Sequence, residues 1–393
     1  MAARRIGVEE RRARLARRHH LAPGSGAGSP VEAASAIVGL HGTDPSSVYL
    51  AAGARMPAAE PATIERALYE DRELVRILGM RRTMFVVPLD LAPVVQAACT
   101  RAIAVQERRR TVQLLTQCGV ADDPAAWLAA LEEATAKVLA THGQGTAAEL
   151  SVHEPRLRTQ LFLAEGKSYA ASQSVSTRVL AQLAAEGRII RGRPRGSWTS
   201  SQYRWTPIEA WLEEGMDDLP TDTARVELVR RWLAAFGPGT AADVKWWTGW
   251  TAGEVKRAVG KLGAVEVDLD GATGLVLPDD LEPVPAAEPW VALLPALDPT
   301  VMGWAGREWY LGEHGGALFD RNGNAGPTIW WDGRVVGGWA HRKDGEVAYR
   351  LLEDVGADAA KAVAAGAERL CTWIGDVRIT PRFRTPLERD LSA

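Results

Sequence analysis

Two ten-residue segments of this chain are near copies of each other, and they constrain its fold more than any other feature. Residues 141–150 read THGQGTAAEL, and residues 235–244 read AFGPGTAADV. In both segments a glycine ends one helical pattern and a threonine is placed to cap the next helix. Recurrence of such a unit within one chain predicts tandem modules.

Each copy lies within the same order of patterns. Residues 125–206 predict three helices followed by a β-hairpin, the order of a winged-helix domain, and this order begins again near Thr223. A more divergent copy precedes both. Its helical patterns run from residue 31, include a predicted helix over 62–80, and end at the β-branched strand RRTMFVVP.

The pattern changes near residue 288, where short alternating strands begin, with turn signals such as Asp332-Gly333. We therefore expect an α+β chain with three tandem winged-helix modules and a small C-terminal β-barrel-like domain. The expected divisions are a first module with an N-terminal basic helix, a second module, a third module and a β-rich domain, over residues 1–117, 118–215, 216–285 and 286–393.

Positive charge is concentrated on parts of a chain whose formal net charge is only −3. Residues 187–206 contain five arginines and no acidic residue. Arginine suits bidentate contacts with phosphate, and aromatic rings can stack on bases. We therefore predict that the second wing contacts DNA, and we add two arginines that begin the first module's strand. The predicted DNA-binding residues are Arg191, Arg193, Arg195, Trp198, Arg81 and Arg82.

Two other conspicuous segments do not indicate one particular function. The arginine-rich helix near residues 8–21 is compatible with phosphate binding and equally with an ordinary exposed helix face. The tryptophans of KWWTGW, like Trp330, Trp331 and Trp339, are more typical of core and interface packing than of base stacking.

Several classes of function lack their sequence signals. The three cysteines are far apart and the histidines are scattered, so we expect no metal and no disulfide framework. There is no phosphate-binding GxxxxGK[ST] loop and no strand-linked GxGxxG, so we expect no cofactor. No apolar run is long enough to span a bilayer. We expect a cytoplasmic, nucleoid-associated monomer.

The segment LHGTD, residues 40–44, carries three polar side chains where a helical pattern stops. Local rules explain most of it: Gly42 turns the chain, Thr43 or Asp44 caps the next helix, and Pro45 is its first residue. His41 has no role in that interpretation. Alternatively, a histidine and an aspartate three positions apart could bracket a catalytic water. The residues themselves do not decide between the two.

Several phrases, taken in order along the chain, resemble the tandem winged-helix DNA glycosylases of the AlkZ/YcaQ type. They are IVGLHGTDPSSVYLAAGAR, LVRILGMRRTMFVVP, AFGPGTAADVKWWTG, LLPALDPTVMGW and DRNGNAGPTIWWDGRVVGGW. The resemblance covers nearly the whole chain. It implies three winged helices and a small β-barrel curved around duplex DNA. It also implies hydrolytic excision of alkylated purines, including N7-alkylguanines and interstrand crosslinks.

The catalytic motif of that family, Gln-x-Gln or Gln-x-Asp, falls on His41 and Thr43, and neither position matches. We therefore consider a substitute in which His41 accepts a proton from water, Thr43 positions that water and Asp44 stabilises the developing positive charge. Such a mechanism would lose activity as the pH falls through the histidine pKa.

The leading function is accordingly a DNA repair or self-resistance protein that acts on alkylated duplex DNA. The alternative is a non-catalytic winged-helix protein, either a transcriptional regulator or a lesion binder. A C-terminal domain that binds a small ligand is a third possibility, for which the sequence offers no motif.

Overall fold

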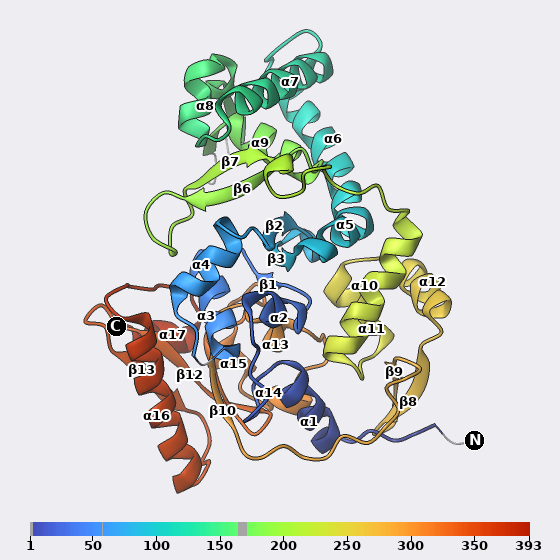
Figure 1. Ribbon diagram of the computed structural model, residues 1–393, viewed down its shortest axis with the longest axis vertical. Coiled ribbons are helices and arrows are strands. Elements are labelled where there is room, and N and C mark those ends of the chain that lie inside the picture. Colours follow the sequence, from blue (N-terminus) through green and yellow to red (C-terminus); the bar gives the residue numbers. More distant parts are fainter. Residues whose placement is uncertain (1–2, 57, 164–170) are drawn as a thin grey trace.

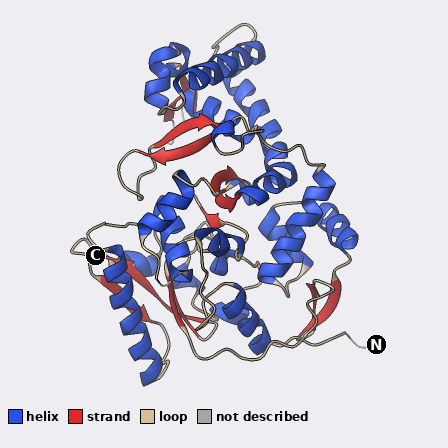
Figure 2. Ribbon diagram, in the orientation of Figure 1, coloured by secondary structure: helices blue, strands red, loops and turns tan. Residues whose placement is uncertain are grey.

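The computed structural model describes residues 3–56, 58–163 and 171–393 and shows a mixed fold of helices and small antiparallel sheets (Figure 2). In Figure 1 the chain leads from the blue helices to the green region at the top. It returns through yellow helices on the right and ends in a red sheet and helix at the lower left. We use first, second and third unit for residues 30–88, 124–207 and 221–276.

The first unit combines three helices with a three-stranded antiparallel sheet of order β1-β3-β2. Its elements are α2 (Pro30–Ser35), β1 (Leu40–His41), α3 (Pro45–Arg55), α4 (Pro61–Tyr69), β2 (Leu74–Leu78), η1 (Met80–Arg82) and β3 (Met84–Pro88). The helix predicted over 62–80 was wrong beyond Tyr69. The run LVRIL pairs with β3 instead, because two strands can bury its branched side chains on a common sheet.

The second unit is preceded by a mostly helical connection and contains the predicted three helices and hairpin. The connection comprises η2 (Leu89–Leu91), α5 (Ala92–Val95), the π-helix η3 (Gln96–Thr100) and α6 (Arg101–Gln117). The unit comprises α7 (Pro124–His142), α8 (Ala147–His153), η4 (Pro155–Arg158), β4 (Gln160–Leu163), β5 (Ala171–Ser174), α9 (Ser176–Ala185), β6 (Ile189–Pro194) and β7 (Tyr203–Pro207). The small β4-β5 sheet between α8 and α9 was not predicted.

The third unit has the same order without an inserted sheet and follows the short helix η5 (Ile208–Ala210). Its elements are α10 (Thr221–Phe236), α11 (Ala241–Thr248), α12 (Ala252–Leu262), β8 (Val265–Leu269) and β9 (Ala272–Val276). Both α11 and α12 begin with a capping box, at Thr240 and Thr251, and both end at a left-handed glycine, as their sequence signals indicate.

One backbone contact recurs in all three units. The turn between the first two helices donates an N–H to the second strand of the hairpin. Gly42 N lies 2.7 Å from Met84 O, Gly145 N lies 2.9 Å from Trp205 O, and Gly239 N lies 3.3 Å from Leu275 O. The recurrence found in the sequence therefore reflects a shared backbone arrangement.

The C-terminal part contains an open antiparallel sheet of order β10-β11-β12-β13. Its elements are β10 (Val291–Leu294), α13 (Pro299–Met302), α14 (Glu308–Leu311), α15 (Gly315–Leu318), β11 (Thr328–Trp331), β12 (Arg334–His341), β13 (Val347–Leu351), α16 (Ala357–Ile374) and α17 (Pro386–Leu391). The expected barrel-like closure was wrong: β10 and β13 are the two edges, and α16 contacts both of them instead. The predicted turn at Asp332-Gly333 joins β11 to β12.

The hydrophobic core does not follow the order of the units. One large cluster runs through the first unit, the third unit and the C-terminal sheet, and it includes the fully buried Ile37, Trp232 and Trp330. The second unit has a separate cluster around residues such as Leu128 and Val179. The second unit thus has a core of its own, and a small third cluster lies between Ile6 and the β8-β9 hairpin.

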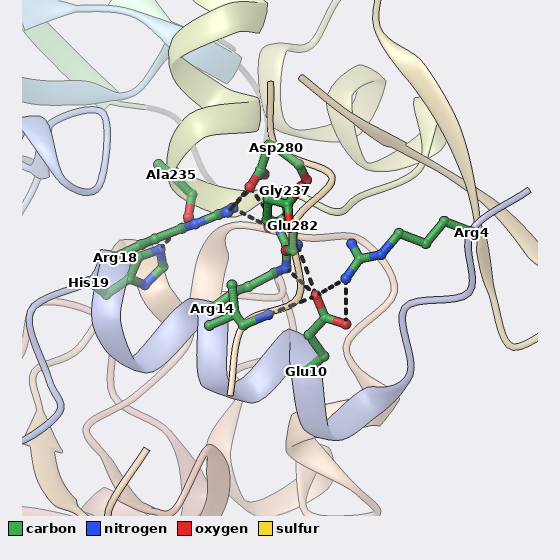
Figure 3. Close-up of polar contacts among 10 residues, drawn as sticks. Arg4, Glu10, Arg14, Arg18, His19, Ala235, Gly237, Asp280 and Glu282 are labelled. Atoms are coloured by element: carbon green, nitrogen blue, oxygen red, sulfur yellow. Dashed lines mark hydrogen bonds and ion pairs between the residues drawn. The ribbon is translucent and has the colours of Figure 1, made fainter. Parts of the chain in front are cut away.

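The N-terminal helix α1 (Val8–Arg18) is held by ion pairs against the segment that follows the third unit (Figure 3). Arg14 and Arg18 each lie 2.6 Å from the carboxylate of Asp280, and Arg4 and Arg14 each lie 2.8 Å from Glu10. Arg14 is only 1% exposed. These three arginines therefore have a structural role, which decides the question that the sequence left open for them.

Candidate active site and DNA interface

Asp44 ends the LHGTD turn as the N-cap of α3, with Pro45 in the first turn of the helix. Its Oδ1 accepts hydrogen bonds from Ser46 N at 3.0 Å and Ser46 Oγ at 2.7 Å. Its Oδ2 accepts one from the backbone N–H of Arg382 at 2.9 Å, which ties the C-terminal segment to the turn. The capping role predicted from local rules is confirmed for Asp44.

The other two units show what this turn requires. Thr146 and Thr240 occupy the position of Asp44, and each forms a capping box. The shared backbone contact matches Gly42 with Gly145 and Gly239. Counted from that glycine, His41 corresponds to Gln144 and Pro238, and Thr43 has no counterpart, because the first unit has one more residue before its cap. The other two units form this turn without a histidine and without the extra threonine, so the turn itself requires neither side chain.

His41 and Thr43 each leave a buried polar atom without a hydrogen bond. His41 is 4% exposed, pairs with Phe85 across the sheet, and has its ring 5.4 Å from the Phe85 ring. Among the described residues, neither His41 Nδ1 nor Thr43 Oγ1 has a partner. Buried polar atoms are nearly always paired, so two unpaired atoms in one turn indicate a place where a ligand or water completes the structure.

The charge state of His41 follows from its surroundings. Burial, together with the positive charge of Arg81, lowers the pKa of His41 to about 3. The imidazole is therefore neutral at physiological pH. It then offers one N–H donor and one nitrogen acceptor, whereas a glutamine amide offers two N–H donors and a carbonyl oxygen acceptor, so the two share at least one donor and one acceptor.

Arg76 contacts the turn, and the sequence analysis did not identify it as a site residue. It is 5% exposed on β2, its Nη1 is 3.4 Å from the carbonyl oxygen of Gly42, and its guanidinium lies 4.9 Å from the ring of Tyr203 on the second wing. It thus links the turn to the second unit. The run LVRIL does not reveal whether its arginine is buried or exposed. The face of the sheet on which Arg76 lies depends on the register of strand pairing, which the run alone does not specify.

The arginines of the second wing are largely occupied by contacts within the chain. Arg193 forms ion pairs at 2.8 and 2.9 Å with Glu65 of α4 and with Glu70, the residue that follows this helix. The guanidinium of Arg191 lies over two aromatic rings of β7, at 5.7 and 5.2 Å. Arg195 is 61% exposed, and its closest carboxylate lies at 4.0 Å. Of the three, Arg195 is the most accessible to DNA.

Trp198 corrects part of the prediction for this wing. Its side chain is 9% exposed and packs 5.1 Å from Tyr49 and 6.1 Å from Trp373. The ring belongs to the large hydrophobic cluster, so it is not available to stack on a base. The sequence suggested an exposed hairpin tip, but this wing folds back onto the first unit and α16.

Arg81 and Arg82 lie at the tip of the first hairpin, where both residues have positive φ angles. Arg82 pairs with Glu107 of α6. The Arg81 guanidinium lies 3.9 Å from the ring centroid of Trp246 on α11. The prediction that the tryptophans of KWWTGW pack in the core is confirmed for Trp247 and Trp250, whereas Trp246 is half-buried beneath this arginine.

Residues 3–56, 58–163 and 171–393 contain no group of three histidine, cysteine, aspartate or glutamate residues that could hold a metal ion. No helix in these ranges is long and apolar enough to cross a membrane.

The fold and the site fit the class of DNA repair glycosylases: the chain has helical units with hairpins, and one turn carries two unpaired polar atoms. Comparison with known proteins assigns the chain to a family of this class. The model of the family described as "DNA glycosylase AlkZ-like" matches residues 34–373. The chain belongs to this family. A search of curated proteins finds no match.

A comparison with solved structures agrees with the fold. The chain is similar to the Streptomyces sahachiroi DNA glycosylase AlkZ, with a TM-score of 0.71 and 21% sequence identity. The match covers 97% of this chain and 99% of that one. The two proteins therefore share an architecture over almost their entire lengths.

Proposed function

We propose that this protein hydrolyses the N-glycosidic bond of alkylated purines, such as N7-alkylguanine, in duplex DNA, as a repair or self-resistance enzyme. The observation that carries the proposal is the pair of unpartnered buried atoms, His41 Nδ1 and Thr43 Oγ1, in a turn that forms without either side chain in the other two units. Membership of the AlkZ-like family supports it.

The reaction requires little from the protein because the substrate is activated. An N7-alkylated guanine is cationic, so cleavage of the bond between the sugar C1′ and N9 leaves its electron pair on a neutral base. The sugar becomes an oxocarbenium-like cation that a water molecule must attack. His41 and Thr43 hold that water, and the nearby Asp44 carboxylate favours the positive charge on the sugar.

The low pKa of His41 changes the mechanism considered from the sequence. With a pKa of about 3, His41 is a hydrogen-bond acceptor that orients water and does not retain its proton, which passes to solvent. The expected loss of activity near the ordinary histidine pKa is therefore moved to about pH 3. His41 acts as a neutral amide would.

Several finer assignments belong to the same proposal. The three units act as winged-helix modules on duplex DNA, and the protein acts as a monomer at the nucleoid. Arg82, Arg191, Arg193 and Arg195 contribute contacts with phosphate, of which Arg195 is the most exposed. Interstrand crosslinks are a second substrate to test.

The direct test is single-turnover excision from a duplex that contains N7-methylguanine, with abasic sites revealed by mild alkali. We expect His41→Ala to lower the rate by about 10²-fold, the usual cost of removing one positioned polar group. His41→Gln restores an amide and should recover part of the loss. Arg369→Gln, on the exposed face of α16, is the control for general damage to the protein. Equal rates for wild type and His41→Ala would exclude His41 as a catalytic residue.

A non-catalytic DNA-binding protein is the alternative, favoured by one observation. His41 is 4% exposed, so a water that it holds must reach an almost closed site. Absence of abasic sites with wild-type protein, together with a sequence-selective footprint on undamaged DNA, would establish this alternative.

A further inference from the structure

Two arginines from distant parts of the chain share one tryptophan ring near His41. The guanidinium carbon of Arg81 lies 3.9 Å from the ring centroid of Trp246, and that of Arg307 lies 4.6 Å from the same centroid. Arg81 comes from the tip of the first hairpin, Trp246 from α11, and Arg307 from the N-terminal end of α14. All three side chains are half-buried. We call them the arginine–tryptophan cluster.

The charges of this cluster are not neutralised within the chain. In the described ranges no carboxylate lies within ion-pair distance of Arg81 or Arg307, unlike Arg14, Arg18 or Arg55. Arg81 Nε is buried without a partner, and Arg307 Nε donates to the carbonyl of Trp304 at 2.9 Å.

The carboxylate of Asp243 is close enough to influence Arg307, but its oxygens are already in use. Oδ1 accepts from Ala305 N and Gly306 N, and Oδ2 accepts from the backbone N–H and hydroxyl of Thr240. Burial and the charge of Arg307 lower the pKa of Arg81 to about 10. Asp243 and Glu308 partly oppose the charge of Arg307, but neither forms an ion pair with it. In the described ranges the free protein therefore places two positive charges on one ring, with no ion pair to either of them.

The cluster adjoins the candidate active site. Arg81 lies in the hairpin whose strand β3 pairs Phe85 with His41. The ring of Phe85 in turn lies 6.4 Å from that of Trp247, the residue next to Trp246 on α11. The charge of Arg81 also reaches His41, whose pKa it helps to lower.

We infer that Arg81 and Arg307 together bind one phosphodiester group of the DNA strand that presents its damaged nucleotide to His41. This inference rests on the proposed function. A phosphate supplies the missing negative charge and accepts several N–H donors from two planar guanidinium groups. Stacking on Trp246 fixes the planes of both groups before DNA arrives, which lowers the entropy lost on binding.

The test is the salt dependence of binding to an undamaged duplex, measured by fluorescence anisotropy over a series of salt concentrations. Each phosphate contact contributes about 0.9 to the slope of log K against log[salt] for duplex DNA. We expect Arg81→Gln and Arg307→Gln each to weaken binding and to reduce the slope, and the double variant to reduce it by about 0.9 in all, because the two arginines share one phosphate. Arg369→Gln removes the same charge from α16 and should leave the slope unchanged.

A thermal melt of each variant separates binding from folding. Because no ion pair holds either guanidinium in the described parts of the free protein, we expect the glutamine variants to melt no lower than wild type. Arg81→Lys and Arg307→Lys keep the charge and should retain the slope even if stacking on Trp246 is weaker. An unchanged slope in Arg81→Gln and Arg307→Gln would overturn the inference, as would a lower slope in Arg369→Gln of equal size.

The excision assay keeps this inference distinct from the proposed function. If His41→Ala abolishes excision while the arginine variants keep the wild-type slope, the glycosylase proposal stands and the phosphate site is wrong. If wild type releases no base while the arginine variants show a smaller slope of log K against log[salt], the phosphate site stands and the catalytic proposal is wrong.

Discussion

His41 is the residue on which the candidate site depends, and its burial gives it properties that its identity alone does not. An exposed histidine changes charge near pH 6.5, whereas this one stays neutral to about pH 3. Neutral imidazole and glutamine amide share one donor and one acceptor, although their shapes differ. On this basis we propose that His41 stands in for the first glutamine of the motif that the resemblance implies.

The same pKa shift makes stability depend on pH. The folded chain resists protonation of His41, while the unfolded chain binds that proton near pH 6.5, so stability present at neutral pH is lost as the pH falls from about 6.5 towards 3. Between about pH 7 and pH 5 this residue should account for a loss of about 2 kcal/mol in the free energy of unfolding. Urea denaturation of wild type and His41→Gln at both pH values measures the difference. An equal loss in the two proteins would contradict the shift.

At the scale of elements, the cap between the first and second helices is the device that all three units share. We expect Thr146→Ala and Thr240→Ala each to lower the free energy of unfolding by about 1 kcal/mol, since each removes a capping box. Asp44→Ala should cost more, because it also removes the acceptor of Arg382 N. Thr146→Ser keeps a hydroxyl cap and serves as the control. Urea denaturation gives all four values, and an alanine effect no larger than that of serine would show that the caps contribute little.

The elements also show where pattern reasoning fails. The segment LVRIL continues a helical pattern on its N-terminal side, yet it becomes β2, because β3 provides a partner strand. The C-terminal strands have the expected alternation and the Asp332-Gly333 turn. Whether such strands close into a barrel depends on how the first and last strands meet, and here α16 packs against both edge strands.

At the scale of the whole molecule, a buried ion pair joins the first unit to the C-terminal part. Arg55 and Asp298 are fully buried, and two hydrogen bonds of 2.9 and 2.8 Å link them. Arg55 also donates to Thr300 Oγ1 at 2.6 Å. His19 Nε2 donates to the carbonyl oxygen of Ala235, so Nδ1 is the acceptor nitrogen of the neutral ring. The Thr300 hydroxyl donates its proton to that Nδ1. One polar network thus joins the end of α1 to α3 and α13.

Breaking this pair should destabilise the large shared core. We expect Arg55→Met to cost about 3–5 kcal/mol, because it leaves the Asp298 charge buried and unpaired. Adding Asp298→Asn should recover part of that cost. Lys261→Met, which removes an exposed ion pair with Asp222, should cost less than about 1 kcal/mol. Chemical denaturation tests the series, and a small effect of Arg55→Met would show that the interface relaxes or admits water.

The sequence by itself determined the repeated order of helices and hairpins, the caps that begin α8 and α11, and the LHGTD turn with either Thr43 or Asp44 as its cap. These features depend on local backbone geometry and on short-range periodicity, which residue identities specify directly. Only the tertiary structure decided that Trp198 is buried, that Arg14 and Arg18 hold Asp280, and that the C-terminal sheet is open. It also brought Arg81, Trp246 and Arg307 together beside His41. Burial, charge compensation and pKa depend on which distant segments pack together, and no single segment of the sequence carries that information.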